Sequence, residues 1–438
     1  MKYLRALLPI ALFAIVVGIA AGCGGNAQSP AASGSLTLFI EPQAGKAPVL
    51  DAMHEAKTSL RVVMYQITDP DFIQGMKNAV SRGVDVRLIL EMNPYGGSSG
   101  NVDVGADLQS AGVKLKWDPR TINYLHQKTI VVDDRYAVIT TGNMTSSAYS
   151  ANREYGLIVR DQAMVQEIAS VFQADWDRTR PEISHPNLAW APLNARQFLV
   201  AMIDSAQAAI DMEQQNMQDD EILDHLGQAV RRGVRVRLIS SPHYPLETDT
   251  DEAGRERLRL AGGQVRYLQD PYVHAKVFVI DDQQGFVGSE NLTTNSLDFN
   301  RELGVLFDDA AAVAQMRDQF AVDWAAGIIE AFPTSSQTVP ESGYIDHKDA
   351  KKFLYQEVTV EMPVRELYNS GRVIWLMPDA DRDSNFKVVI FPSDWDKWPE
   401  TPDVYYQGKT IRVTGLIKTY RGWPETIIND PGQIEVVP

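Results

Sequence analysis

Two short segments of the chain repeat the same pair of reactive residues. His126 and Lys128 stand two positions apart, and His274 and Lys276 repeat them 148 positions later. Residues two apart on an extended segment project from one face, so each copy presents an imidazole and an ammonium together. Because an imidazole titrates near neutral pH, one His can attack phosphorus while the other protonates the departing oxygen. Each copy is therefore half of a site.

The repetition continues beyond the His–Lys pairs at the same spacing. The first copy is followed by Thr141, Asn143 and Glu154, and the second is followed by Ser289, Asn291 and Glu302. Two lysines and two asparagines would supply fixed donors around the charge on phosphoryl oxygens. A single His-x-Lys would more often be a surface accident, but two copies with matching downstream residues argue against coincidence.

These segments resemble the two HxKxxxxD…GSxN signatures of the phospholipase D superfamily. The signatures lie in residues 126–133 with 140–145 and in residues 274–281 with 288–293, and the resemblance covers about residues 35–332. It implies an α/β fold class, a duplicated domain of two similar halves with one site on the pseudo-twofold axis between them. It also implies phosphodiester cleavage through a covalent phosphohistidine, with no metal and no other cofactor.

Carried over residue by residue, the resemblance implies a definite set of site residues. The catalytic residues would be His126, Lys128, Asn143, Glu154, His274, Lys276, Asn291 and Glu302. The resemblance also makes His126 the nucleophile and His274 the general acid. Asp133 and Asp281 complete the motifs, and we expect them to serve the fold. Thr141 stands where the second copy has Ser289, so the half-sites need not be equivalent.

Composition places the chain among globular proteins of more than one domain. Its 438 residues suggest about three units, and 44% of them are hydrophobic while 22% are charged. The formal net charge of −16 argues against a protein that grips nucleic acid by bulk electrostatics. A local basic groove remains compatible with that balance.

The N-terminal stretch has the layout of an export signal. Lys2 and Arg5 precede the apolar residues 6–19, and small residues lead to Cys23, the single cysteine of the chain. Residues 1–22 therefore predict a signal peptide that resembles the lipobox of bacterial lipoproteins, although Ala20 stands where Leu is usual. We expect lipidation of Cys23 and a protein anchored to a membrane of the bacterial cell envelope. A plain secretory signal with an incidental cysteine is the alternative.

Motif spacing and composition divide the remainder into a spacer and three units. Residues 23–34 are small and polar, as is typical of a flexible spacer. Residues 35–182 and 183–332 are the predicted phospholipase D-like halves, and alternating strands and helices predict a largely parallel sheet in each. Residues 343–438 follow a stretch rich in Ser, Thr and Pro and form the third unit.

The third unit is predicted to be a small all-β barrel. Its expected strands are residues 357–362, 373–376, 386–391, 410–418 and 425–428. This pattern resembles the OB-fold domains attached to bacterial nucleases, which bind single strands through aromatic and basic residues. The candidates for such contacts are Trp375, Phe386, Tyr420, Arg421 and Trp423. A barrel that packs on the catalytic halves or on a protein partner is the alternative.

Two functions are compatible with these features. The first is a metal-independent phosphodiesterase of the nuclease type, anchored in the envelope. The second is a phospholipase D or phosphatidyltransferase that acts on membrane phospholipids. The sequence leaves open which phosphodiester enters the site, and whether water or an alcohol completes the reaction.

Overall fold

The computed structural model describes residues 35–95, 100–119, 121–243, 248–329, 331–332, 337–371, 373–380, 386–420 and 423–437. The expected signal peptide, the spacer and Cys23 lie outside these residues, and so does Arg421. Among the residues described, none of the helices combines the length and the apolarity needed to cross a bilayer.

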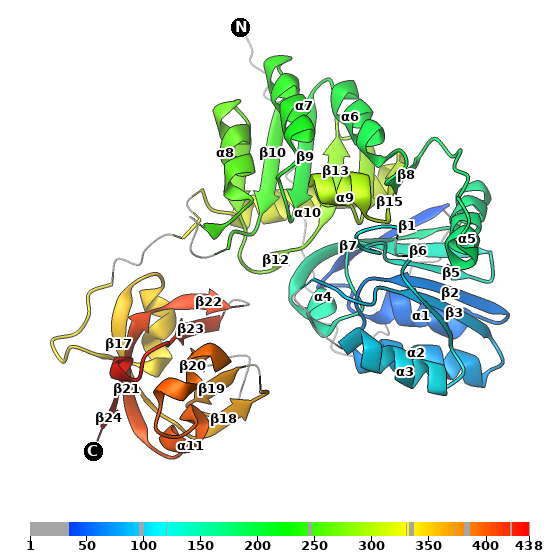
Figure 1. Cartoon of the computed structure of the whole chain (residues 1–438). Helices are drawn as coiled ribbons and strands as arrows, with labels where there is room; N and C mark the ends of the chain where they lie inside the picture. Colours follow the sequence, from blue (N-terminus) through cyan, green and yellow to red (C-terminus); the bar gives the residue numbers. More distant parts are fainter. Residues whose placement is uncertain are drawn as a thin grey trace, which may run out of the picture. The chain divides into compact units, whose positions relative to one another are not determined.

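The first half is built on one mixed sheet (Figure 1). Its strands pair in the order β1-β7-β6-β5-β2-β3-β4. They are β1 (Leu36–Glu41), β2 (Ser59–Met64), β3 (Asp85–Leu90), β4 (Lys114–Trp117), β5 (Thr129–Val132), β6 (Tyr136–Thr140) and β7 (Asn152–Val159). Only β2, β3 and β4 run parallel to one another, and the other neighbours are antiparallel.

The prediction of a largely parallel sheet is therefore wrong, and the reason lies in the turn after β5. Residues 133–135 alone join β5 to β6, with Asp133 and Asp134 at positive φ. Parallel neighbours need a crossover of a dozen or more residues, so this short turn forces an antiparallel return. The motif strand is thus the first strand of a meander that ends in β7.

Helices cover the sheet of the first half. They are α1 (Ala47–Glu55), α2 (Pro70–Ser81), α3 (Gly100–Ser110), the short α4 (Ser146–Ser150) and α5 (Gln162–Asp177). The start of α2 shows why they form where they do: the Asp69 side chain accepts the N–H of Asp71, and Pro70 occupies the first turn. Gly83 follows the helix at positive φ, as the sequence predicted.

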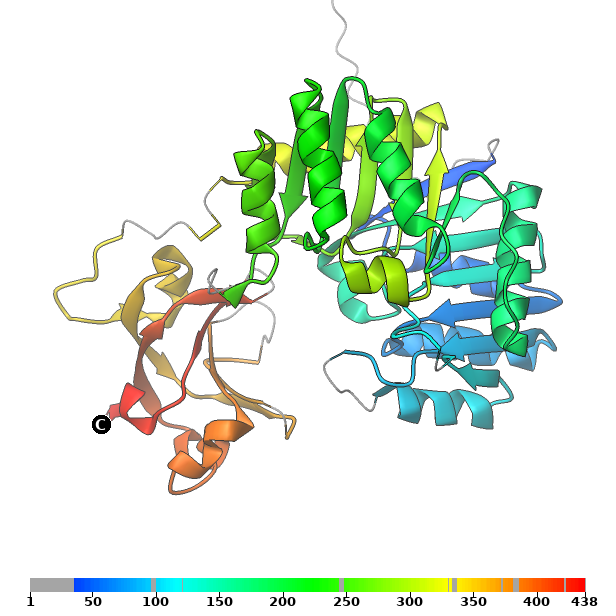
Figure 2. The ribbon, with the colours of Figure 1, turned by 45° about the horizontal axis from the view of Figure 1, so that its top comes forward.

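The second half repeats this plan. Its sheet has the order β11-β10-β9-β13-β14-β15-β8. The strands are β8 (Leu188–Ala191), β9 (Ala209–Gln214), β10 (Arg235–Ser240), β11 (Gln264–Tyr267), β13 (Lys276–Ile280), β14 (Gln284–Gly288) and β15 (Glu302–Phe307). The helices are α6 (Ala195–Ser205), α7 (Asp220–Arg231), α8 (Glu252–Leu260), α9 (Thr294–Phe299) and α10 (Ala310–Ala326). Figure 2 shows α6, α7 and α8 side by side over one face of this sheet.

The C-terminal unit contains two small sheets. One pairs β16 (Ile345–Asp346), β17 (Glu357–Pro363), β21 (Thr410–Leu416) and β24 (Ile434–Val437). The other pairs β18 (Glu366–Asn369), β19 (Ile374–Met377), β20 (Lys387–Ile390), β23 (Trp423–Ile427) and β22 (Lys418–Tyr420). The predicted strands are found within a few residues of their expected bounds, but β16, β18, β22 and β24 were not predicted as strands. Closure of these sheets into a barrel stays a prediction.

Two buried ion pairs join the catalytic halves. Arg153 of the first half donates to Asp323 of the second, with Nε–Oδ2 at 2.6 Å and Nη2–Oδ1 at 3.0 Å. Arg301 of the second half donates from Nη2 to Oδ1 of Asp175 in the first half at 2.9 Å. The pairs are equivalent, because each member recurs 148 positions later. A shared apolar core, which includes Leu38 and Phe307, surrounds them.

Removing one partner of such a pair should destabilise the catalytic halves. We expect Asp323→Ala to lower the free energy of unfolding by about 3–5 kcal/mol, because it leaves the Arg153 charge buried and unpaired. Asp318→Ala on the same helix is the control: its side chain is 71% exposed and, among the described residues, forms an ion pair with Arg317. Urea denaturation followed by tryptophan fluorescence measures both. Equal midpoints for the two variants would contradict a structural role for the buried pair.

Candidate active site

The two predicted half-sites meet where the halves join. His126, just before β5, contacts Glu302 of β15 through Nδ1, at 2.9 and 3.0 Å from the two carboxylate oxygens. His274, just before β13, contacts Glu154 of β7 through Nδ1 at 2.7 Å. A carboxylate accepts, so each Nδ1 carries the proton and each Nε2 keeps a lone pair. Each imidazole is thus oriented by the opposite half.

Backbone pairing between the halves sets this register. β12 (Tyr272–Val273) pairs with β7, and the N–H of His274 donates to the carbonyl of Arg153 at 3.2 Å. In the other direction, the N–H of His126 donates to the carbonyl of Arg301 at 3.0 Å. The backbone of each histidine is therefore bonded to the residue that precedes the Glu contacting its imidazole. A slip of one residue would turn the side chains to the other face.

The two lysines lie buried beside the histidines. Lys128 is 1% exposed and Lys276 is fully buried. The Nζ of Lys276 donates to the carbonyl of His274 and, at 2.9 Å, to Oε1 of Gln215. The Nζ of Lys128 donates to the carbonyl of His126 and lies 5.4 Å from the ring centre of Tyr65. The ammonium groups thus stand close to the imidazoles that they would assist.

Burial and neighbouring charges shift the pKa of every ionisable group in the site. Burial lowers the pKa of His126 to about 4, although Glu302 opposes the shift. Burial likewise lowers the pKa of Lys128 to about 7 and that of Lys276 to about 8. Burial alone would raise the pKa of Glu302, but the facing His126 and Lys128 outweigh it, and the pKa is lowered. At neutral pH the site therefore holds neutral imidazoles between ionised carboxylates.

The predicted asparagines and hydroxyl residues also gather here. Among the described residues, Oδ1 of Asn143 and Oδ1 of Asn291 are buried without a hydrogen-bond partner, so both amides are available to a ligand. The hydroxyl of Thr141 donates to Glu154 at 2.6 Å. Ser289 only accepts the N–H of Leu303, at 3.1 Å.

The motif aspartates serve the fold, as expected. Asp133 accepts the backbone N–H groups of residues 57–59, at 2.8–3.2 Å. Asp281 accepts those of residues 207–209 in the same way, at 2.7–2.9 Å. These bonds lower the pKa of both carboxyl groups against the opposing effect of burial. Each Asp holds the start of the strand next to its own motif strand, β2 in the first half and β9 in the second.

Three residues in or beside the site were not predicted. The ring of Tyr65 meets that of His126 edge to face, with centroids 4.7 Å apart. Ser296 of α9 donates to Glu302 at 2.7 Å, which supplies in the second half the hydroxyl that Thr141 supplies in the first. Glu290 is buried, its carboxylate oxygens have no partner among the described residues, and burial raises its pKa far above its usual value. Tyr65 and Glu290 differ in type from their counterparts in the other half, so matching of the repeats does not find them.

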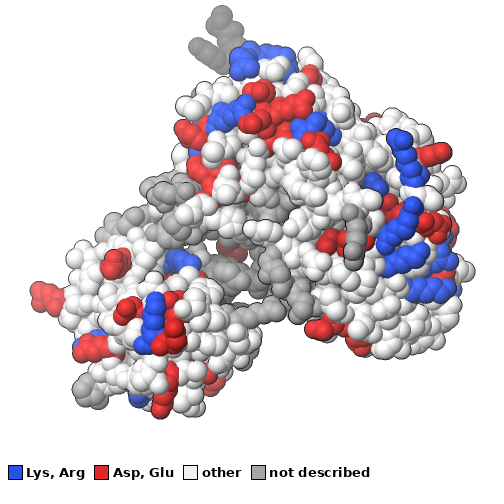
Figure 3. All heavy atoms as spheres, in the orientation of Figure 1, with Lys and Arg blue, Asp and Glu red and all other residues white. Residues whose placement is uncertain are grey.

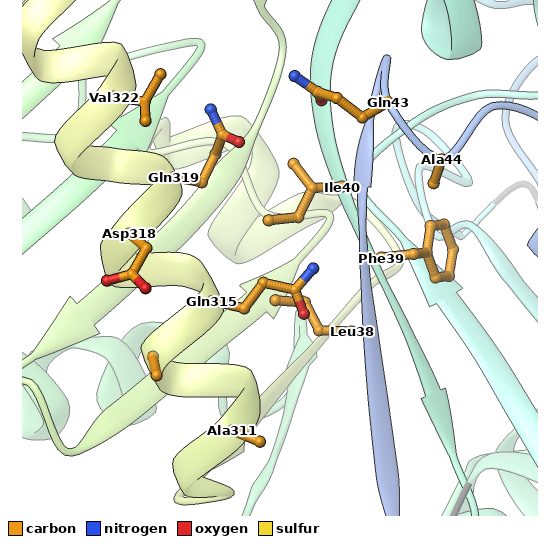
Figure 4. Close-up of a pocket in the computed structure, with 11 residues that line it drawn as sticks. Leu38, Phe39, Ile40, Gln43, Ala44, Ala311, Gln315, Asp318, Gln319 and Val322 are labelled. Atoms are coloured by element: carbon orange, nitrogen blue, oxygen red, sulfur yellow. The ribbon is translucent and has the colours of Figure 1, made fainter. Parts of the chain in front are cut away.

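Cavities of different character lie in the two halves, and one of about 550 Å³ is lined by Asp175, Arg178 and Arg301 among others. A groove of about 760 Å³ between β1 and α10 is lined by side chains that include Leu38, Ile40 and Gln315 (Figure 4), and no predicted catalytic residue lines it. A smaller cavity of about 310 Å³ is lined by His274, Glu154 and Asn143 among others. The smaller cavity is therefore the one that borders predicted catalytic residues.

The C-terminal candidates that the structure describes have different surroundings. Phe386 is 2% exposed within the apolar core, so its prediction as a base-stacking residue is wrong: as the residue before β20, it fills the space between the sheets. Trp375 is half-buried against Tyr368, with Lys387 4.6 Å from its ring centre. Trp423 lies 5.3 Å from Lys351. Tyr420 is part of β22, and Arg421 lies outside the described residues.

Charge is distributed without a strong bias over the visible surface. On the face drawn in Figure 3, acidic and basic side chains of the described residues are intermixed. The same residues contain no group of three or more His, Cys, Asp or Glu side chains placed to hold a metal ion.

Comparison with known proteins agrees with this geometry. Residues 49–176 and 199–324 match the family model described as "Cardiolipin synthase, PLD-like domain". The two matched stretches make up more than half of the chain and coincide with the two halves of the fold. The chain therefore belongs to this phospholipase D-like family.

Individual relatives are more distant. A polyphosphate kinase of Klebsiella pneumoniae is 24% identical over 279 residues, which are 59% of this chain and 40% of the kinase. Cardiolipin synthase A of Pseudomonas entomophila is 30% identical over 138 residues, which are 30% of this chain and 28% of the synthase. The chain thus spans well under half the length of these relatives. The crystal structure of phosphatidylserine synthase from Haemophilus influenzae has a TM-score of 0.53 at 12% identity and covers 68% of this chain and 87% of its own, a likeness of fold.

The lowered lysine pKa values predict an alkaline limit to activity. We expect kcat/KM to fall as pH rises through about 7 to 8, because Lys128 and Lys276 then lose the protons that neutralise phosphoryl oxygens. Lys276→Arg should shift the contribution of position 276 to this fall in kcat/KM to higher pH, since a guanidinium does not titrate between pH 7 and 8. The profile is measured with a small phosphodiester. A flat profile up to the usual lysine pKa of about 10.4 would contradict the argument.

Proposed function

We propose that the protein is a metal-independent phosphodiester hydrolase that acts through a phosphohistidine. The observation that carries the proposal is the crossed pairing of His126 with Glu302 and of His274 with Glu154. Each pair consists of an imidazole and a carboxylate that stabilises it when it becomes charged, and Nζ of Lys276 lies 3.4 Å from Nε2 of His274. Two such pairs supply a nucleophile and an acid in a single site.

The geometry favours His126 as the nucleophile. Its pKa of about 4 keeps it unprotonated at neutral pH, and the ring of Tyr65 fixes its orientation. Its Nε2 attacks phosphorus, while His274, protonated when the anionic substrate binds, gives its proton to the departing alcohol oxygen. His274 then takes a proton from water, whose oxygen attacks phosphorus and releases His126. Lys128 and Lys276 neutralise the phosphoryl oxygens in both steps.

The substrate class is a separate proposal, and we favour nucleic acid. A C-terminal unit with short strands and a partly exposed Trp375 is consistent with an OB-fold platform for single strands. The alternative is a phospholipid, supported by the matching family model and by relatives named cardiolipin synthase and phosphatidylserine synthase. Both substrates are phosphodiesters and suit the same two histidines.

The mechanism predicts different consequences for the two histidines. With a p-nitrophenyl diester, whose leaving group needs no protonation, His274→Ala should still form phosphoenzyme in a quenched burst, whereas His126→Ala should form none. Wild-type activity should survive EDTA. His185→Ala, which changes a histidine outside the site, is the control. The reverse pattern would exchange the roles of the two histidines. Activity that is lost in EDTA and restored by a divalent ion would contradict the mechanism.

The nucleic-acid proposal is tested on Trp375. We expect Trp375→Ala to weaken binding of a labelled single-stranded oligonucleotide by about 1–3 kcal/mol in fluorescence anisotropy at fixed salt, because base stacking is lost. Val404→Ala, at an exposed position of the same unit, is the control. If the two variants bind equally well, the phospholipid alternative gains.

We also propose that the protein is exported and anchored by a lipid on Cys23, which rests on the sequence of residues 1–23 alone. Cys23→Ser should then move the protein from the membrane fraction to the soluble fraction with its specific activity kept. Cell fractionation with immunoblotting measures the distribution. An unchanged distribution would rule out the lipid anchor.

A further inference from the structure

Each catalytic Glu has a second glutamate beside it that the mechanism does not use. In the first half this is Glu41, which ends β1 directly opposite Glu154 of β7. Opposite residues of neighbouring strands project to one face, and Figure 4 shows that Phe39, two residues before Glu41, lies on the side of β1 away from Leu38 and Ile40. Glu41 and Glu154 are each 1% exposed. Two carboxyl groups are therefore buried side by side.

In the second half the additional glutamate comes from a different position. Ala191 stands opposite Glu302, so β8 supplies no acid there. The acid is Glu290, whose Oε2 lies over Gly288 and Gly304, an opposite pair on β14 and β15. A Cβ atom at Gly288 would come within 2.1 Å of that oxygen, and one at Gly304 within 2.9 Å. Because Gly304 is two residues from Glu302 on one strand, the Glu290 carboxyl lies on the face that carries Glu302.

The two additional acids do not correspond in the internal repeat. The counterpart of Glu290 is Gly142, 148 positions earlier. A Cβ atom at Gly142 would come within 3.2 Å of the Glu154 side chain, so a larger residue there would crowd the catalytic Glu. Each half thus places one acid beside its catalytic Glu by a different route. This agreement between unmatched positions points to a requirement that both Glu–His pairs share.

Neither additional carboxyl group has a partner that compensates a charge. Oε2 of Glu41 accepts the N–H of Gly45 at 2.6 Å, and its Oε1 is buried without a hydrogen-bond partner in the described part of the chain. Among the same residues, both oxygens of Glu290 are buried and unpartnered. A buried carboxylate without a partner is much less stable than the protonated acid, and a second carboxylate nearby disfavours ionisation further. The surroundings thus favour the uncharged form of both residues.

The charged groups around Glu41 agree with this assignment. Burial raises the pKa of Glu41 to about 8, and Glu154 adds to the shift, while the N–H of Gly45 and the charge of Arg153 oppose it. The other titratable groups of this cluster are Tyr149 of α4, which faces the charges of Glu41 and Glu154, and Asp69, which pairs with Lys46 at 2.6 Å.

The charged groups around Glu290 act in the same direction. Burial raises the pKa of Glu290 well above its usual value, and Glu302 adds to the shift. The nearby N–H groups of residues 289 and 290 and the charge of Lys128 oppose it. Since Glu41 keeps one hydrogen bond to its carboxylate and Glu290 keeps none, Glu41 should lose its proton at the lower pH.

We propose that Glu41 and Glu290 are positioning residues, each a protonated acid that leaves the catalytic Glu beside it as the single negative charge of its half-site. The inference rests on the proposed phosphohistidine chemistry, in which each ionised Glu stabilises one imidazole. While the additional acid keeps its proton, an anionic phosphodiester meets one carboxylate in each half. Loss of that proton places a second negative charge in the same desolvated space, which repels the substrate.

The first test detects the protons directly. A protonated carboxyl group and a carboxylate absorb at different infrared frequencies, so subtracting the spectrum of a Glu→Gln variant from that of the full-length wild type isolates one residue. For Glu41→Gln we expect the band of a protonated carboxyl at about pH 6.5 and its loss at about pH 9.5, on either side of the pKa of Glu41. For Glu290→Gln the band should be present at both pH values. Absence of either band at the lower pH would overturn the proposal.

The second test measures the consequence for an anionic substrate. kcat and KM for a p-nitrophenyl diester are measured between the same pH limits. The ratio of kcat/KM in Glu41→Gln to that in the wild type should rise about tenfold with pH, mainly through KM, because only the wild type gains a charge at this position. Glu41→Ala, which copies Ala191 of the second half, should show the same rise and replaces the Gln variant if that variant does not fold.

Glu256→Gln is the matched control, because this side chain is 53% exposed and pairs with Arg259 away from the site. Its ratio to the wild type should not change with pH. A ratio that is equally flat for both Glu41 variants would overturn the coupling of Glu41 to substrate binding. A wild type that does not cleave the diester is a different result: it removes the proposed function, and the infrared bands, which require no turnover, still decide whether the two acids hold their protons.

Discussion

The site depends on contacts in which each half supplies the Glu that pairs with the histidine of the other half. Neither half contains a complete catalytic pair: His126 relies on Glu302, and His274 relies on Glu154. Backbone hydrogen bonds from each histidine to the residue before the opposite Glu fix the register of the two halves. The buried Arg–Asp pairs between the halves stabilise the same arrangement. A buried ion pair adds little net stability but tolerates few alternative geometries. The buried ion pairs here help to position the Glu carboxylates, which must lie within hydrogen-bond distance of the imidazoles.

The two halves are similar because they are repeats, but the residues at a few equivalent positions differ between them. Thr141 supplies the hydroxyl to Glu154, while Ser296 of another element supplies it to Glu302. Because Thr141 does this alone, Ala148 can be small, and a cavity opens on that side. Tyr65 packs on one histidine where Gln215 bonds the opposite lysine. The proposed mechanism needs a nucleophile and an acid with different surroundings, and these positions give the two histidines different surroundings.

The repeat in the sequence predicted both the halves and the set of residues that converge. His, Lys, Asn and Glu at one spacing could be matched because chemistry restricts their types. The Arg–Asp pairs were also visible in principle, since Asp175-Trp176 and Asp323-Trp324 recur at that spacing. Strand direction and the burial of Phe386 were not predictable, because turn length and three-dimensional packing decide them. Residues that differ between the two halves are not found by matching the repeats.

The charge balance of the site explains how one histidine acquires its proton. Without substrate, Lys128 and Lys276, whose pKa values burial lowers to about 7 and 8, face two carboxylates, and burial keeps both imidazoles and Glu290 uncharged. A phosphodiester adds a negative charge to this balanced, desolvated cluster. Charge in a low-dielectric site favours uptake of a compensating proton, and the imidazole beside the leaving oxygen is the group that can hold it. In the proposed mechanism, substrate binding and protonation of the acid are therefore coupled through the charge of the buried site.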